Sequence, residues 1–171
     1  MKKQREEKDL LGKTKKDPRL IFDEDPQNYD TMRPHYCPEL FQKVIEEAKI
    51  TSASKVLEIG LGTGQATLPF LLTGCRLTGI EIGENMAAFA GRKFADFPNI
   101  QVITGSFEQV PLAKEDYDLI FSATAFHWID PDRGLAKVYD ALKEGGWFAW
   151  FSNHPQTNEA YAQGNQALQK I

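Results

Sequence analysis

Short apolar runs alternate with amphipathic stretches along most of the chain. The apolar runs cover residues 55–60, 76–81, 99–104, 117–123 and 147–152, and the amphipathic stretches lie near 38–49, 65–73, 84–95 and 131–143. Short apolar runs are typical of buried strands, whereas apolar residues recurring every three to four positions are typical of helices. The pattern therefore predicts strands and helices that take turns along the chain.

This alternation predicts an α/β fold. The strand segments are almost continuously apolar, as expected for a parallel sheet that is covered by helices on both faces. Right-handed crossovers then produce a Rossmann-like, doubly wound sheet. In such sheets the ligand crevice lies at the carboxyl ends of the strands, beside the first strand, where the strand order reverses.

Length and composition bound the class of protein. A chain of 171 residues is long enough for one domain with a proper core. No apolar run approaches the roughly 20 residues that span a bilayer, and no secretion signal opens the chain. The two cysteines, Cys37 and Cys75, and the three histidines are scattered, so neither a disulfide framework nor a metal site is indicated. We expect a cytoplasmic protein without a membrane partner.

Charge is unevenly distributed. Residues 1–19 contain eight basic and four acidic side chains, whereas the remaining 152 residues contain 12 basic and 20 acidic ones. A basic arm can bind nucleic acid, but acidic residues interrupt this one and no aromatic residue lies within it. We therefore expect a charged, partly disordered leader over residues 1–26, a folded domain over 27–171, and no nucleic-acid partner.

A glycine-rich loop follows the first predicted strand, with Glu58 before it and Gly60, Gly62 and Gly64 within it. Glycines allow a positive φ and a close approach of ligand to backbone. A dinucleotide loop, G-x-G-x-x-G, would need its third glycine at position 65, which is Gln65. S-adenosyl-L-methionine (SAM) carries an ammonium and a sulfonium instead of a diphosphate, so a carboxylate at Glu58 suits it. The loop favours SAM over a nicotinamide dinucleotide.

An acidic residue ends the second predicted strand. The carboxylate of Glu81 is placed to accept hydrogen bonds from two ribose hydroxyls. That function is common to SAM and dinucleotide sites, so Glu81 indicates a ribose without naming the cofactor. Ile82 and Met86 follow directly and are expected to flank the adenine ring.

Five segments in this order resemble the motifs of class I SAM-dependent methyltransferases. They are VLEIGLGTGQAT, LTGIEIGENM, GSFEQVPL, YDLIFSATAFHWID and ALKEGGWFAWF, within residues 27–152. The resemblance implies five parallel strands in the order 3-2-1-4-5 and SAM as cofactor, leaving as S-adenosyl-L-homocysteine (SAH). It also implies a small-molecule methyl acceptor, because the upstream Tyr29, Arg33, Pro34 and Tyr36 and the segment AFHWID resemble a small-molecule group that includes the trans-aconitate-type and ubiquinone-biosynthesis-like enzymes.

The loop after the third strand departs from the family pattern. That loop often carries Gly-Asp-Ala, whose aspartate bonds the adenine amino group, whereas this chain has Gly105, Ser106 and Phe107. The resemblance implies that Ser106 accepts one hydrogen bond from the adenine and that Phe107 packs on the ring. Upstream, Tyr29 and Arg33 are expected to fold over SAM, with Arg33 binding the methionyl carboxylate in a bidentate pair.

The segment from Ser122 to Trp128 leaves the fourth strand and is expected to face the transferred methyl group, with Ser122 touching the cofactor. His127 is a candidate general base, because imidazole titrates near neutral pH; packing against the next helix is the alternative. Trp128 either packs beneath that helix or donates its indole N–H to an acceptor carboxylate. The His-Trp pair after the fourth strand resembles that of enzymes that methylate carboxylic acids, and this resemblance implies a small acid or similar acceptor. A carboxylate needs no base at neutral pH, so His127 would then orient the acceptor.

Family members usually continue past the fifth strand with a helix and two antiparallel strands. Here residues 153–171 predict a loop and one polar helix, so we expect those final strands to be absent. A bare apolar edge strand is an aggregation hazard, which suggests a truncated chain or a second subunit, such as that of a dimer, over the edge. Two alternatives to an active methyltransferase stay open, a SAM-binding module without turnover and a nicotinamide-dependent oxidoreductase.

Overall fold

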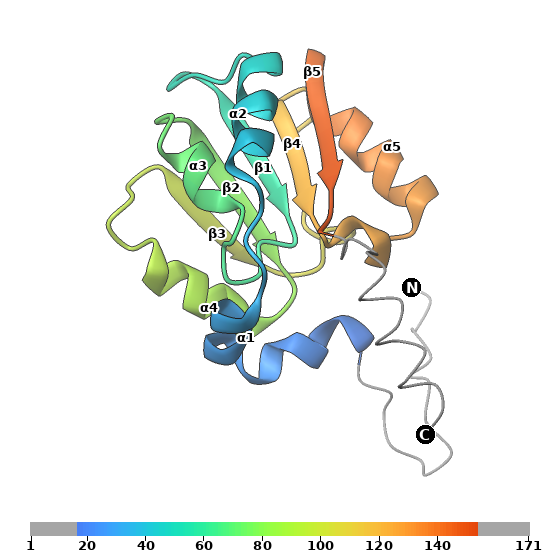
Figure 1. Cartoon of the computed structure of the whole chain (residues 1–171). Helices are drawn as coiled ribbons and strands as arrows, with labels where there is room; N and C mark the ends of the chain where they lie inside the picture. The colour runs from blue at the N-terminus through green and yellow to red at the C-terminus, as the bar shows by residue number, and fades with distance from the viewer. Residues whose placement is uncertain (1–16, 154–171) are drawn as a thin grey trace, which may run out of the picture.

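A single five-stranded sheet forms the centre of the computed structural model, which describes residues 17–153. All four pairs of neighbouring strands are parallel, and the order is β3-β2-β1-β4-β5 (Figure 1). The strands are β1 Lys55–Ile59, β2 Arg76–Glu81, β3 Ile100–Thr104, β4 Tyr117–Ala123 and β5 Leu142–Phe151. The predicted fold class and strand order are confirmed. Residues 1–16 and the predicted C-terminal polar helix lie outside the described residues.

Several helices begin at an aspartate–proline pair. Asp17, Asp25 and Asp130 each precede a proline and accept a hydrogen bond from a backbone N–H of the first turn. This arrangement caps the helix while the proline ring presets its first dihedral angle. The helices are η1 Pro18–Glu24, α1 Pro26–Met32, α2 Pro38–Glu47, α3 Thr67–Leu71, α4 Glu84–Lys93, η2 Phe126–Trp128 and α5 Pro131–Ala141, where η denotes a 3₁₀-helix.

Apolar side chains cover both faces of the sheet. Successive residues of a strand point to opposite faces, and in β1 Val56 packs into one core whereas Leu57 and Ile59 pack into the other. The first core lies under α2, α3 and α4, and the second lies under α5 and η2 (Figure 1). The three-layer arrangement leaves the carboxyl ends of the strands free to build a site.

The last strand differs from its predicted form. The pattern indicated a strand from residue 147, but β5 begins at Leu142 and its register against β4 shifts before Trp147. Gly145, with φ of 75°, lies within this irregular part. β5 is an edge of the sheet among the described residues, and Trp147 and Trp150 are 47% and 56% exposed there.

The segment before residue 27 contributes to the fold. The sequence assigned residues 1–26 to a charged leader, whereas η1 packs against α4. No helix within residues 17–153 is long and apolar enough to cross a membrane.

Candidate functional site

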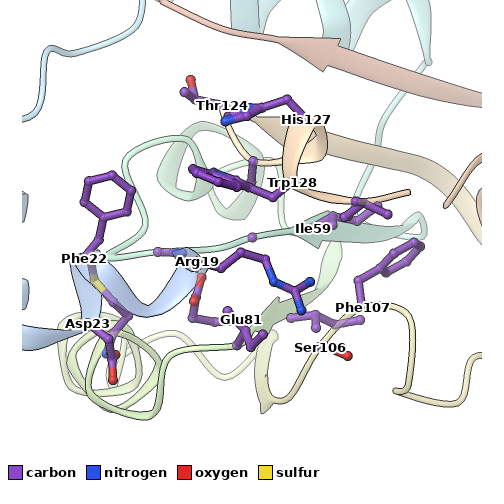
Figure 2. Close-up of a pocket in the computed structure, with 18 of the residues that line it drawn as sticks. Arg19, Phe22, Asp23, Ile59, Glu81, Ser106, Phe107, Thr124, His127 and Trp128 are labelled. Atoms are coloured by element: carbon purple, nitrogen blue, oxygen red, sulfur yellow. Dashed lines mark hydrogen bonds between the residues drawn. The ribbon is translucent and has the colours of Figure 1, made fainter. Parts of the chain in front are cut away.

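A cavity of about 320 Å³ opens at the carboxyl ends of the strands, within the size range of small-molecule sites. Its walls come from η1, α1, the glycine loop, the ends of β2 and β3, and the segment after β4 (Figure 2). It brings together most of the residues singled out from the sequence, namely Tyr29, Arg33, Gly60, Gly62, Glu81, Ile82, Met86, Ser106, Phe107, His127 and Trp128. The crevice therefore lies where the doubly wound topology predicts it.

Glu81 ties the glycine loop to the end of β2. One carboxylate oxygen accepts the N–H of Gly62 at 2.7 Å and the other accepts the N–H of Gly83 at 2.8 Å. The side chain is only 8% exposed. Burial raises the pKa of its carboxyl, and the two backbone donors oppose that shift. Each oxygen keeps a lone pair, so the carboxylate can also accept hydrogen bonds from a ligand in the cavity.

Gly62 shapes the cavity through its backbone. Its φ is 57°, a backbone conformation that residues with a Cβ rarely adopt. A Cβ built there would have no atom of the chain closer than the Gln65 side chain at 3.8 Å and the Tyr29 ring at 3.9 Å. The position is thus open on the ligand side, as a close approach of ligand to backbone requires.

Glu58 does not line the cavity, contrary to the expectation that it faces a cationic ligand. It is 1% exposed and accepts a hydrogen bond from the Thr67 hydroxyl at 2.7 Å. Burial raises the pKa of its carboxyl to about 8, although the Thr67 bond opposes the shift. Glu58 thus braces β1 against the first residue of α3, beneath the loop.

Two further predicted contacts have structural roles. Gly64 lies outside the cavity lining, and a Cβ there would lie 2.3 Å from the Phe94 ring, so the position serves close packing. Ser122 is fully buried and donates its hydroxyl to the carbonyl of Ile59 at 2.9 Å. Neither residue lines the cavity. The Ser122 hydroxyl instead links β4 to β1.

Apolar side chains form part of the end of the cavity beside β2 and β3. Ile82, Met86 and Phe107 line it, and Phe107 and Met86 are almost fully buried. Lys137 of α5 fixes the loop after β3, since its ammonium donates to the carbonyl of Phe107 at 2.6 Å and to that of Val110. This end suits a flat, partly apolar group such as a nucleobase.

The opposite end of the cavity is built after β4. Thr124 has a positive φ of 58°, unusual for a β-branched residue, and its hydroxyl lies 2.6 Å from that of Tyr36. His127 and Trp128 follow in η2 with ring centroids 5.0 Å apart. Figure 2 shows Thr124, His127 and Trp128 across the cavity from Glu81 and Ser106. The aromatic side chains are exposed enough to meet a second ligand, with Trp128 42% exposed.

Residues of η1 also line the cavity and were missed from the sequence. Arg19, Phe22 and Asp23 all face it, and Asp23 accepts the N–H of Met86 at 2.9 Å, which caps α4. The charge distribution of residues 1–19 led to the prediction of a partly disordered leader, so no site residue was sought there. The signal that could have found it is the Asp17-Pro18 pair, which is typical of a helix start.

Comparison with known proteins decides the family. The family model described as a methyltransferase domain matches residues 57–150. The chain belongs to the class I SAM-dependent methyltransferases. This membership removes the nicotinamide alternative, in agreement with the absence of a glycine at position 65. Gln65 instead donates a 3.3 Å hydrogen bond to Asp30 of α1.

Curated relatives and a solved structure agree with this assignment. An uncharacterized methyltransferase of Schizosaccharomyces pombe is 29% identical over 145 residues, 84% of this chain and 54% of the relative. A malonyl-[acyl-carrier protein] O-methyltransferase of Marinomonas sp. is 30% identical over 135 residues, 74% of this chain and 47% of the relative. The chain spans about half the length of the curated relatives it matches. A SAM-dependent methyltransferase of Aquifex aeolicus shares the fold, with a TM-score of 0.65, 19% identity, and 85% and 87% of the two chains covered.

The cavity of this methyltransferase domain fits SAM. Glu81 offers acceptors for ribose hydroxyls beside the apolar end, where adenine can pack. Arg33 lines the cavity, lies 5.2 Å from the Tyr29 ring centroid and forms no ion pair with any described residue. Its guanidinium is therefore available to the methionyl carboxylate. The cofactor is SAM, and the predicted contacts of Glu58, Gly64 and Ser122 with it are replaced by packing roles.

Proposed function

We propose that this chain forms the cofactor site and part of the acceptor site of an enzyme that methylates a small molecule, with a carboxylic acid as the favoured acceptor. Bound SAM supplies a methyl group already activated by its sulfonium, so positioning of the acceptor provides most of the catalysis. The observation that carries the proposal is the wall of Thr124, His127 and Trp128 across the cavity from Glu81.

The chemistry of this wall favours an anionic acceptor. Its polar groups are a hydroxyl, an imidazole and an indole N–H, and none is a carboxylate. The indole of Trp128 donates to no acceptor among the described residues, so it is available to a ligand oxygen. The matching relative from Marinomonas is named for O-methylation of a malonyl group, which carries a free carboxylate in its thioester form. This likeness supports an acid acceptor here.

A pair of variants tests the acceptor class in the complete enzyme. For a carboxylate acceptor, Trp128→Phe should raise KM because it removes the indole donor and keeps most of the apolar surface. His127→Asn should slow turnover only modestly, and the rate should stay flat above about pH 6, because a carboxylic acid is already ionised there. The measurement is methyl transfer to a panel of acids, phenols and amines between about pH 5.5 and about pH 9.

Other outcomes would change the proposal. A loss of roughly 10²–10⁴-fold in His127→Asn would identify His127 as a general base and the acceptor as a hydroxyl or amine. Binding of SAH without methyl release to any member of the panel would instead identify a SAM-binding module. Unchanged kinetics in both variants would remove His127 and Trp128 from the acceptor site.

A further inference from the structure

Helix α1 carries part of the cavity wall but buries little of its own surface. Tyr29 of α1 and Arg33, which ends it, line the cavity. None of the residues Pro26–Met32 is fully buried, and a helix of about two turns is unstable by itself. The place of Arg33 at the cavity therefore depends on the contacts that tie α1 to the rest of the domain.

Asp30 joins α1 to two distant elements. Its Oδ1 accepts a hydrogen bond from the Lys93 ammonium at 2.7 Å and one from the Gln65 side-chain amide at 3.3 Å. Lys93 ends α4, which lies beside α1 (Figure 1), and Gln65 follows the glycine loop. The Asp30 side chain is 23% exposed, so solvent screens this ion pair less than one on the open surface.

The lysine and the glutamine also hold the glycine loop. The Lys93 ammonium donates to the Thr63 carbonyl at 3.1 Å, and the Gln65 amide donates to the Thr63 hydroxyl at 2.5 Å. Thr63 is fully buried, so it is a fixed point of the loop. One network, which we call the α1 clamp, thus consists of Asp30, Thr63, Gln65 and Lys93. It fixes α1 against the glycine loop.

The α1 clamp determines where the guanidinium of Arg33 lies. Asp30 directly follows Tyr29, whose ring lies 3.9 Å from the position that a Cβ of Gly62 would take. The guanidinium carbon of Arg33 lies 5.2 Å from the centroid of the same ring. Arg33 therefore keeps its place at the cavity only while α1 keeps its place against the loop.

The methionyl end of SAM is the part of the cofactor that suits this place. With adenine at the end beside β2 and β3 and the ribose at Glu81, the methionyl group extends toward the glycine loop and Arg33. Arg33 forms no ion pair with any residue in 17–153, so its guanidinium is available to the methionyl carboxylate. A bidentate pair needs one planar geometry, so a shift of Arg33 weakens it.

We propose that Asp30 and Lys93 are positioning residues for the cofactor, because they hold α1 where Arg33 can bind the methionyl carboxylate. Neither residue lines the cavity, so both act through Arg33. The inference rests on SAM occupying this cavity, as the proposed function also requires, and is independent of the acceptor's identity.

Two ligands that differ only in the methionyl part test this role. SAH carries the carboxylate, whereas methylthioadenosine keeps the adenine, the ribose and the thioether and has a methyl group in place of the amino-acid part. In Asp30→Ala, calorimetry should show SAH binding weakened about fivefold and methylthioadenosine binding changed by less than about twofold, the scale of one partly exposed ion pair. Alanine is a better helix former than aspartate, so helix propensity does not account for such a loss.

A double-mutant cycle determines whether Asp30 acts through Arg33. Arg33→Gln should weaken SAH binding by roughly tenfold, as expected for a bond between charged groups, and leave methylthioadenosine binding nearly unchanged. Asp30→Ala added to Arg33→Gln should then cause no further loss, because no guanidinium remains to be positioned. The full loss of SAH binding in that background would overturn the proposal.

Lys93 provides a second, independent variant. Lys93→Met should reproduce the loss seen in Asp30→Ala, whereas Lys93→Arg keeps N–H donors for both partners and should keep the wild-type ratio of the two affinities. The matched control is Glu47→Ala, which removes a 2.6 Å ion pair with Lys43 on α2, outside the cavity, and should change neither affinity. Thermal unfolding identifies any variant that fails to fold, and the ratio in Lys93→Met decides the question if Asp30→Ala does so.

The outcomes are distinct. Equal weakening of both ligands, or no weakening of either, in a folded Asp30→Ala or Lys93→Met would overturn this inference and leave the cofactor assignment standing. Failure of the wild-type chain to bind either ligand would overturn the occupancy of the cavity by SAM, and with it the proposed function.

Discussion

The two ends of the cavity are built in different ways. At the cofactor end, hydrogen bonds to the backbone fix the walls, since Glu81 accepts the N–H groups of Gly62 and Gly83 and its carbonyl accepts that of Gly105. At the acceptor end, the short helix η2 presents aromatic side chains, and Trp128 is 42% exposed. The cofactor end is held by a buried carboxylate bonded to the backbone of two loops, whereas the acceptor end presents exposed side chains on a short helix.

This difference teaches which part of the site the chain itself specifies. A wall held by buried backbone bonds keeps one shape, because breaking such bonds leaves donors unpaired. A wall of side chains on a short helical turn can be lined differently without disturbing the sheet, which is why specificity commonly resides in such segments. We therefore expect substitutions at the cofactor end to affect both the free energy of unfolding and the binding of SAH. Substitutions at the acceptor end should leave the binding of SAH unchanged.

The largest effect is expected within the glycine loop. In Gly64→Ala the new Cβ would meet the Phe94 ring at 2.3 Å with φ at 83°, so overpacking and backbone strain should lower the free energy of unfolding by about 3 kcal/mol. In Gly62→Ala only the strain applies, a loss of about 1 kcal/mol, but the methyl group enters the ligand space. Urea unfolding and SAH calorimetry measure the two effects.

The two glycine variants should differ in their binding of SAH. Gly62→Ala should weaken SAH binding by about tenfold, because one methyl group forced into a filled space costs roughly 1–3 kcal/mol. Equal loss of stability in both variants, with normal SAH binding by Gly62→Ala, would show that the loop does not contact the cofactor.

The next effect concerns Glu58, beneath the same loop. Its pKa is raised to about 8 by burial, so the folded chain keeps a proton that the unfolded chain releases above about pH 4.5. The free energy of unfolding should therefore fall as the pH rises from about 5 to about 8, with a slope approaching about 1.4 kcal/mol per pH unit from this group. Glu58→Gln mimics the protonated form and should remove that slope, as urea unfolding across this range would reveal. Parallel pH profiles for variant and wild type would contradict the assignment.

The smallest effect is expected at the acceptor end. Tyr36→Phe removes the hydroxyl that lies 2.6 Å from Thr124 and should cost about 1 kcal/mol of unfolding free energy. Because this bond supports only the segment after β4, SAH affinity should stay unchanged. A loss of SAH affinity alongside the loss of stability would show that the two ends of the cavity are coupled, and would contradict their independence.

Much of the fold was predictable because its local signals agree. The strands at 76–81 and 117–123 were predicted with the bounds of β2 and β4, since each is an apolar run ended by a turn. β5 was predicted five residues too short at its start, because the irregular part around Gly145 and Gly146 breaks the apolar pattern.

The site was less predictable, because a motif gives positions along the chain and not the direction of each side chain. Leu57 and Ile59 point toward the core under α5, so Glu58 between them points to the other face, toward Thr67 and away from the cavity. Three-dimensional pairing also places Arg19 at the cavity, since its hydrogen-bond partner Glu108 lies 89 residues away in the sequence. No local pattern predicts such a pair.

The cap that Asp23 places on α4 has a consequence for the order of folding. The capping carboxylate and the N–H of Met86 are 63 residues apart in the sequence, and the N-cap residue Gly83 has no side chain of its own to offer. Closing so long a loop is entropically unfavourable until the intervening sheet has formed. The first turn of α4 should thus mature only after β1 and β2 have paired. The wall that carries Met86 would then be among the last parts of the molecule to become native.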